Sequence, residues 1–211
     1  MEDLIIIGGG GHSKSVIDSA ETMGLFRIIG ILTTNNKPLF GYQNIGGDDA
    51  LPILYSQGVR YCFIAIGSIG DTEPRYRLYK KVLELGYNLP NIVDPSSTVS
   101  KRILFGKGIF VGKNAIINAN SEIEDMVIIN SGATIEHDCS IGNLVHIAPG
   151  AVICGNSKIG NGTHIGAGAT VMQGIVIGEH TLIGCGSVVV SDIPGGVKAY
   201  GNPCKVVGRF P

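Results

Sequence analysis

The sequence predicts two domains, an α/β Rossmann-like domain over residues 1–94 and a parallel β-helix over residues 95–211. Short apolar runs alternate with helical patterns in the first part, as expected for parallel strands joined by helices. In the second part an aliphatic residue returns at every sixth position, which is the signature of a hexapeptide β-helix. A chain of 211 residues is long enough to give both domains a core.

Four apolar runs predict the strands of the first domain, because strands buried on both faces of a parallel sheet are apolar throughout. The runs are "DLIIIG", "FRIIGIL", "YCFIAIG" and "NIVD". We expect helices over "SKSVIDSAETMG", which ends at Gly24, and over "EPRYRLYKKVLELG". In the second helix Arg77, Lys80 and Lys81 are interpreted as a solvated face. The turn-rich segment "TTNNKPLFGYQNIGGDDALP", residues 33–52, is expected to be a surface connection.

The second domain is predicted from a single register of apolar residues. Each hexad is expected to form one side of a triangular prism, so that three hexads close a coil and the span supplies about five coils. A small or β-branched residue stands two positions before most inward residues, and glycine often follows them, as at Gly160 and Gly166. We expect these glycines at corners that need positive φ. The expected inward residues are Val99, Phe105, Val111, Ile117, Ile123, Ile129, Ile135, Ile141, Ile147, Ile153, Ile159, Ile165, Val171, Ile177, Ile183 and Val189.

Composition excludes several classes of function. The net charge is −1, from 16 Lys and Arg against 17 Asp and Glu, so no general field favours nucleic acid. No apolar segment is long enough to span a membrane, and the start "LIIIG" runs into glycines, unlike a signal peptide. The five cysteines form no CxxC pair, which is typical of reduced thiols in the cytoplasm. Cys139 falls on an inward position and is expected to be a buried, inert thiol.

Two histidines in "SGATIEHDCSIGNLVHIAPG" are candidates for chemistry. His137 and His146 lie beside inward isoleucines and are therefore expected at outward or corner positions. Their separation of nine residues is half a coil, which places them on roughly opposite sides of one prism. A neighbouring prism can bring them together, so we predict a homotrimer with three sites between subunits. His164 and His180 are interpreted as ordinary surface or subunit-contact residues.

Three phrases together resemble one enzyme family. They are "IIIGGGGHS" in the first domain, "INSGATIEHDCSIGNLVHIAPGAVICG" in the hexads and "GGVKAYGNPCKVVG" in the tail. The chain is similar to the sialic acid O-acetyltransferase and bacterial nucleotide-amino-sugar N-acetyltransferase family of left-handed hexapeptide-repeat acyltransferases. The resemblance covers nearly the whole chain. It implies transfer of an acetyl group from acetyl-CoA to a sugar used for surface polysaccharide or glycan synthesis in the cytoplasm.

By this resemblance His137 is the general base and Asp138 its partner. A thioester is already activated, so the reaction needs no covalent enzyme intermediate. It needs a group that removes the proton of the nucleophile, and imidazole titrates near neutral pH. A carboxylate on the other ring nitrogen would fix the tautomer of the ring. The implied contacts to acetyl-CoA, with no metal, are His146, Gly155, Ala167, Cys185 and Lys205.

The first domain is implied to hold the nucleotide-linked sugar. The glycine run after the first strand lets backbone amides approach phosphates at a helix N-terminus. It is not a dinucleotide fingerprint, because Ser13 stands where the third glycine belongs. Thr33 and Thr34 stand where family members often have acidic residues, so one contact to the ribose or the sugar is expected to differ. The implied substrate residues are Gly10, Gly11, His12, Thr33, Thr34, Gly67 and Ser68.

Other functions stay open at this point. Within the same class the acceptor is an amine or, alternatively, a hydroxyl of sialic acid or a related sugar. A trimeric β-helix can also hold zinc between subunits, as in the γ-class carbonic anhydrases, with His137, His146 and His164 as the available ligands. A trimer without catalysis that binds a nucleotide sugar as a regulator is the third possibility.

Overall fold

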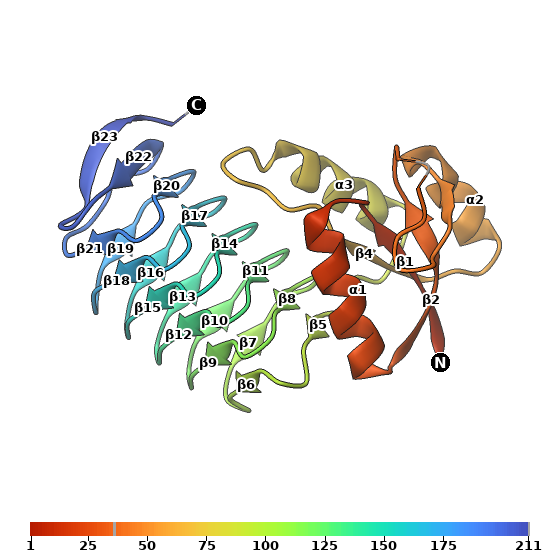
Figure 1. The fold of residues 1–211 in the computed structure, drawn as a ribbon, viewed down its shortest axis with the longest axis horizontal. Coiled ribbons are helices and arrows are strands. Elements are labelled where there is room, and N and C mark those ends of the chain that lie inside the picture. Colours follow the sequence, from red (N-terminus) through yellow and green to blue (C-terminus); the bar gives the residue numbers. More distant parts are fainter. Residues whose placement is uncertain (36, 211) are drawn as a thin grey trace.

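The structure is a computed structural model that describes residues 1–35 and 37–210 and contains two bodies side by side (Figure 1). The N-terminal body is built on a parallel sheet in the order β3-β2-β1-β4. Its strands are β1 (Glu2–Ile7), β2 (Phe26–Leu32), β3 (Asn44–Gly46) and β4 (Tyr61–Ile64). The helical segments are α1 (Gly11–Met23), η1 (Asp48–Ala50), α2 (Leu51–Ser56) and α3 (Glu73–Glu84). The predicted Rossmann-like class is therefore confirmed.

Helices cover both faces of this sheet, which explains the uninterrupted apolar strands. Leu4 and Ile6 of β1 pack on the side of α1, whereas Ile5 and Ile7 pack on the side of α2 and α3. Helix α1 ends at Gly24, whose φ of 66° lies in the left-handed region that glycine adopts without strain.

The segment predicted to be a surface connection, residues 33–52, contains an additional strand. β3 pairs with β2 at the edge of the sheet, and η1 then leads directly into α2. β3 has three residues and no apolar alternation, so no periodicity in the sequence marks it. Pairing with β2 defines it, together with the Asn44 side chain, whose Nδ2 donates to the Thr33 carbonyl oxygen at 2.9 Å. Asn36 lies outside the described residues.

The C-terminal body is a triangular prism, and each of its three faces is a sheet of parallel strands (Figure 1). The five-stranded face contains β7 (Leu104–Phe105), β10 (Glu122–Ile123), β13 (Ser140–Ile141), β16 (Lys158–Ile159) and β19 (Val176–Ile177). The six-stranded face contains β6 (Thr98–Val99), β9 (Ile116–Ile117), β12 (Thr134–Ile135), β15 (Val152–Ile153), β18 (Thr170–Val171) and β21 (Val188–Val189). The eight-stranded face contains β5 (Ile92–Val93), β8 (Phe110–Val111), β11 (Ile128–Ile129), β14 (His146–Ile147), β17 (His164–Ile165), β20 (Leu182–Ile183), β22 (Val197–Tyr200) and β23 (Lys205–Arg209). All pairs in the three faces are parallel except the terminal hairpin of β22 and β23.

The predicted inward register is confirmed throughout the prism. Each strand from β6 to β21 ends on one of the sixteen predicted residues, and all sixteen belong to a single apolar core, with Val99 and Phe105 partly exposed at its first coil. Ladder partners are eighteen residues apart, as Ile135 is from Ile153, so one coil is three hexads. Cys139 is 1% exposed within this core, which confirms the expectation that it is buried. Burial raises the pKa of its thiol and so disfavours the reactive thiolate.

The glycines that follow the inward residues serve a different purpose from the one expected. Positive φ occurs three residues after the inward residue, where Asn120, Asp138 and Leu144 all have φ near 60°. Gly160 and Gly166 have no positive φ. A Cβ on either would lie 2.4 or 2.5 Å from the backbone nitrogen of the next coil. These glycines are required because successive coils approach closely, not because the chain turns there.

The run "NIVD" forms a strand as predicted, but in the other body. β5 pairs with β8 in the eight-stranded face and packs against α1. The N-terminal body thus sits on the eight-stranded face, and the cluster beneath α1 includes Phe110 and Ile128 from the prism. Ser19 of α1 donates to Asp94 at 2.6 Å across this contact.

Candidate active site

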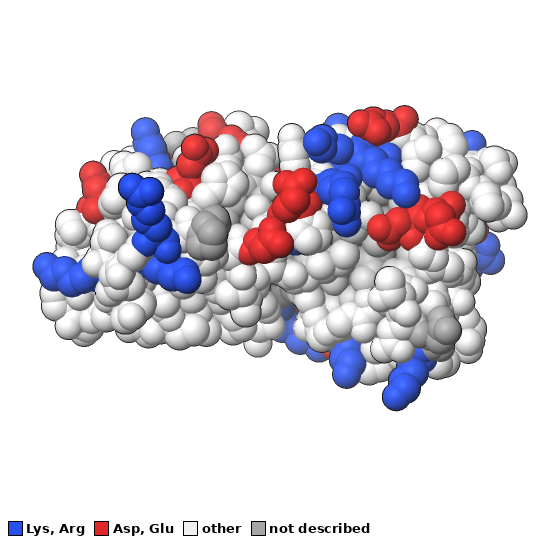
Figure 2. Space-filling model, turned by 90° about the horizontal axis from the view of Figure 1, so that it is seen from above, with Lys and Arg blue, Asp and Glu red and all other residues white. Residues whose placement is uncertain are grey.

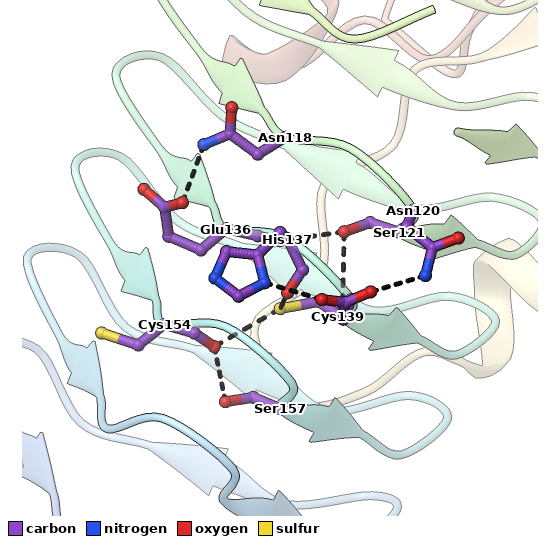
Figure 3. Close-up of polar contacts among 9 residues, drawn as sticks. Asn118, Asn120, Ser121, Glu136, His137, Cys139, Cys154 and Ser157 are labelled. Carbon is purple, nitrogen blue, oxygen red and sulfur yellow. Dashed lines mark hydrogen bonds and ion pairs between the residues drawn. The ribbon is translucent and has the colours of Figure 1, made fainter. Parts of the chain in front are cut away.

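His137 lies on the edge between the six-stranded and five-stranded faces, in the turn from β12 to β13 (Figure 3). We call this the His137 edge, residues 118–121, 136–139 and 154–157. The His137 side chain is 57% exposed, and its Nδ1 lies 2.7 Å from Oδ2 of Asp138. With Nδ1 protonated and donating to that carboxylate, Nε2 is free to accept a proton.

The preceding coil of the prism holds the Asp138 side chain in place. Asn120 stands eighteen residues earlier at the equivalent turn, and its Nδ2 donates to Asp138 Oδ1 at 2.5 Å (Figure 3). This hydrogen bond, followed by the one to His137, holds the pKa of Asp138 below its ordinary value. Asp138 itself adopts φ of 60°, a conformation that aspartate tolerates better than most residues. The carboxylate therefore stays ionised and directed at the ring.

The imidazole of His137 packs against the next coil of the prism. A Cβ at Gly155 would lie 2.8 Å from both Cε1 and Nε2 of His137, so the ring rests directly against this glycine. Gly155 was predicted from the family resemblance as a coenzyme contact. In the structure its neighbour is the candidate base.

The other residues predicted to contact acetyl-CoA lie elsewhere on the prism. Ala167 and Cys185 stack on successive coils at the edge between the eight-stranded and six-stranded faces, where Gly186 N donates to the Ala167 carbonyl. We call this the Ala167 edge. Lys205 is exposed on β23 in the terminal hairpin. The six-stranded face separates the Ala167 edge from the His137 edge, so one chain does not bring the two groups together.

His146 faces its own N-terminal body. Its Nδ1 lies 2.9 Å from the Ser68 carbonyl oxygen, and its Nε2 lies 3.4 Å from Nδ2 of Asn130. Its ring stacks edge-on against His164 at 4.8 Å. His164 is 7% exposed, so the expectation of a surface histidine was wrong there. A coenzyme contact by His146 stays a prediction, because both of its ring nitrogens already have neighbours within the chain.

A cleft of about 610 Å³ opens at the carboxyl ends of the strands in the N-terminal body. This is the position at which open α/β sheets bind ligands. Six of the seven predicted substrate residues line it, at the start of α1 and after β2 and β4: Gly10, Gly11, His12, Thr33, Thr34 and Gly67. Ser68 does not line the cleft and instead contacts the prism through His146.

Three polar residues of the cleft were missed or misassigned from sequence. Asn35, Asp48 and Arg77 line it, although Arg77 was interpreted as part of a solvated face. Arg77 is exposed, but α3 places it beside the glycine loop. Figure 2 shows basic side chains gathered over the part of the N-terminal body where α3 lies. No periodicity distinguishes Arg77 from Lys80, because both are exposed on an amphipathic helix.

The histidines between the two bodies are buried and neutral. Burial, followed by the nearby charge of Arg75, lowers the pKa of His12 to about 3. Burial lowers the pKa of His146 to about 4. Both values lie below the ordinary value of 6.5, so below pH 6.5 the unfolded chain binds more protons than the folded chain. The stability contributed by keeping these rings neutral is present above pH 6.5 and is lost as the pH falls towards 4.

We therefore expect the melting temperature to fall steadily between pH 6.5 and pH 4. Circular dichroism melts across this range measure the dependence. A His146→Asn variant should have a flatter dependence than the wild type, because asparagine does not titrate. His180→Asn, at an exposed corner, is the matched control and should follow the wild type. Equal slopes for the wild type and His146→Asn would contradict the assignment.

The cleft and the candidate base cannot meet within one chain. Among the described residues, none beyond Leu78 lines the cleft. The N-terminal body covers the eight-stranded face, whereas the His137 edge is the corner opposite that face (Figure 1). The cleft and the His137 of the same chain therefore lie on different sides of the prism.

Two general findings bear on the alternatives. Among residues 1–35 and 37–210, no three His, Cys, Asp or Glu side chains gather closely enough to hold a metal ion. His137 lies on a different edge from His146 and His164, so these three candidate zinc ligands do not gather within one chain. In the same part of the chain, no helix has both the length and the hydropathy to cross a membrane.

A glycine-rich α/β cleft joined to a hexapeptide prism with a histidine–aspartate pair on its edge defines a sugar acyltransferase of the β-helix class. Residues 3–82 match the family profile described as PglD N-terminal domain. Residues 120–155 and 156–191 match the profile described as bacterial transferase hexapeptide (six repeats).

Solved structures agree with these matches along the whole chain. PerB from Caulobacter crescentus, in complex with CoA and GDP-perosamine, is 38% identical, with 99% of this chain and 98% of that chain covered and a TM-score of 0.94. A variant of GDP-perosamine N-acetyl transferase from the same organism has the same values. The acetyltransferase domain of PglB from Neisseria gonorrhoeae, in complex with acetyl coenzyme A, is 34% identical, with 98% and 99% covered and a TM-score of 0.92.

The chain therefore belongs to the family of bacterial nucleotide-amino-sugar N-acetyltransferases, built from a PglD-type N-terminal domain and a left-handed parallel β-helix. The predicted family, fold class and type of enzyme, an acetyl-CoA-dependent acetyltransferase, are confirmed.

Proposed function

We propose that this chain transfers an acetyl group from acetyl-CoA to the amino group of a nucleotide-linked amino sugar, with His137 as general base. The observation that carries this role is the His137–Asp138 pair, held at 2.7 Å on an exposed edge with Nε2 of the ring unengaged. Similarity to PerB, solved with CoA and GDP-perosamine, supports the choice of substrates.

The reaction follows from these groups. The amino nitrogen of the sugar attacks the thioester carbonyl carbon, a C–N bond forms and the C–S bond breaks. Nε2 of His137 accepts the proton that the amine loses, and that proton leaves with the thiolate as free CoA. Asp138 stabilises the imidazolium while it exists and keeps Nδ1 as the donor. Asn120 and Gly155 hold this pair in the orientation required.

The site would be completed in a homotrimer. The outward strand positions of the six-stranded face carry no charge along its whole length, being Thr98, Ile116, Thr134, Val152, Thr170 and Val188. The equivalent row on the five-stranded face includes Glu122 and Lys158. An uncharged face is the one suited to a subunit interface. With three such faces around an axis, the His137 edge of one chain would lie beside the Ala167 edge of the next.

The N-terminal cleft would bind the nucleotide part of the acceptor. Unpaired backbone amides at the start of α1 and the guanidinium of Arg77 both suit a diphosphate. Thr33, Thr34 and Asn35 offer neutral hydrogen-bonding groups to the base or ribose. We place the reaction in the cytoplasm, where acetyl-CoA and nucleotide sugars are made, and the five unpaired cysteines are consistent with that compartment.

Acetylation assays with a panel of acceptors test the proposal. We expect free thiol release from acetyl-CoA with a GDP- or UDP-linked amino sugar, and none with the corresponding sugar that carries a hydroxyl instead of the amine. Turnover of sialic acid alone would favour the O-acetyltransferase alternative. Activity lost on chelation and restored by zinc would favour the metalloenzyme alternative.

In the same assay, Arg77→Ala should raise KM for the nucleotide sugar by roughly tenfold to a hundredfold, because a charge-assisted contact to phosphate is lost. KM for acetyl-CoA should stay unchanged. Lys80→Ala is the matched control, because Lys80 lies over the Tyr76 ring on the same helix and does not line the cleft. Equal effects of the two substitutions would contradict the assignment of Arg77.

A further inference from the structure

Arg75 is a buried cation that the proposed mechanism does not use. It lies in the first turn of α3 and is 1% exposed. Burial lowers its pKa to about 10, so the guanidinium remains charged at neutral pH. Among the described residues it forms no ion pair with a carboxylate. A buried charge without a counter-ion is costly, and an apolar residue of similar size would fill the same space at less cost.

The partners of Arg75 lie on both bodies of the molecule. Nη1 donates to Ser68 Oγ at 3.0 Å and to the Leu144 carbonyl oxygen at 3.3 Å, and Nη2 donates to the Met126 carbonyl oxygen. Met126 and Leu144 are the positive-φ corners of two successive coils. One planar guanidinium thus ties the loop after β4 to two turns of the prism, which a single ammonium group cannot do in the same geometry.

That loop belongs both to the cleft wall and to the contact with the prism. Gly67 lines the cleft, and a Cβ there would lie 3.4 Å from Cβ of His12. Ser68, the next residue, is 8% exposed, and its carbonyl oxygen lies 2.9 Å from Nδ1 of His146. Nε of Arg75 and Nε2 of His12 are both buried without a hydrogen-bond partner. The guanidinium therefore lies among groups that connect the cleft to the prism.

We propose that Arg75 is a positioning residue for the acceptor: it fastens the Gly67–Ser68 loop to the corners at Met126 and Leu144, and so sets where the cleft presents the sugar relative to the prisms. This inference rests on the proposed function, because it concerns the path of the nucleotide sugar to His137. Misplacement of a bound reactant by about an ångström is enough to cost up to a hundredfold in rate.

Two substitutions separate positioning from stability. Arg75→Met keeps an unbranched apolar side chain, comparable to the aliphatic part of arginine, without the donors, and Arg75→Lys keeps the charge without the planar fork. We expect both variants to lose roughly tenfold to a hundredfold in kcat/KM for the nucleotide sugar, with KM for acetyl-CoA unchanged. The melting temperature of Arg75→Lys should be closer to the wild-type value than its kcat/KM is. The reason is that stability needs a cation at this position, whereas positioning needs the planar guanidinium.

Ser19→Ala is the matched control. It removes another hydrogen bond between the two bodies, from α1 to Asp94, and neither of these two residues lines the cleft. We expect it to lower the melting temperature while leaving both KM values as in the wild type. If Arg75→Met does not fold, Arg75→Lys and Ser68→Ala test the inference in its place. Ser68→Ala should lower kcat/KM for the nucleotide sugar by less than Arg75→Lys does.

The inference would be overturned if Arg75→Lys and Ser68→Ala both had the same kcat/KM for the acceptor as the wild type. It would also be overturned if kcat/KM changed equally for the acceptor and for acetyl-CoA. An inactive wild type would overturn the proposed function instead. In that case calorimetric titration with GDP and UDP tests Arg75 directly. Weaker nucleotide binding by Arg75→Lys than by Ser19→Ala supports the inference, and equal binding contradicts it.

Discussion

His137→Ala is expected to lower kcat by about 10²-fold to 10⁴-fold, the range that a positioned general base contributes. The substitution leaves Asp138 and Asn120 in place but removes the only unengaged nitrogen of the pair. Thiol release from acetyl-CoA in the presence of the acceptor measures the loss. KM for both substrates should change little, because the ring is proposed to act on the reacting proton and not to hold either substrate.

Added imidazole provides a second measurement. Truncation to alanine vacates the space over Gly155 that the ring occupies. Imidazole should therefore restore part of the activity of His137→Ala in a concentration-dependent way and leave the wild type unaffected. His180→Ala, an exposed corner histidine far along the prism, is the control and should keep wild-type activity. Turnover by His137→Ala close to that of the wild type would refute the proposed base.

Val152→Glu is expected to dissociate the trimer and abolish activity. Val152 lies outward in the middle of the uncharged six-stranded face. In the proposed assembly, one substitution brings three carboxylates together near the axis, where both desolvation and mutual repulsion oppose association. Sedimentation or light scattering measures the mass of the assembly, and the acetylation assay measures the loss of activity.

Val176→Glu is the matched control for this experiment. Val176 occupies the equivalent outward strand position on the five-stranded face, next to Lys158, and is 43% exposed. It should remain a trimer with wild-type activity. A Val152→Glu protein that stayed trimeric would show that the subunits meet through another face. A monomer with full activity would show that the site is complete within one chain.

The prism could be predicted residue by residue because its sequence pattern repeats over a short distance along the chain. An inward side chain recurs at a fixed spacing, and a slip of one residue would expose every isoleucine of the core. The same register identified Cys139 as a buried core residue. The strands of the first domain were equally apparent from their apolar runs, with the exception of β3, which has no apolar pattern of its own.

Misassignments arose where a residue's role depends on a neighbour distant in the chain. Gly160 and Gly166 are needed because another coil lies 18 residues away, although their own backbone angles are ordinary. In the sequence Arg77 cannot be distinguished from other exposed cations, because only the folded chain places it beside the glycine loop. His164 is buried because the N-terminal body covers its face of the prism.

The amino-acid order alone thus predicted the two architectures, from runs of adjacent residues and from a short repeat. The resemblance of three phrases to a known family implied the enzyme class and the histidine–aspartate pair. The docking of one body onto the eight-stranded face, and with it the buried Arg75 and the separation of the cleft from His137, emerged only from the folded chain. These features depend on contacts between segments more than fifty residues apart, and no local pattern encodes which surfaces will meet.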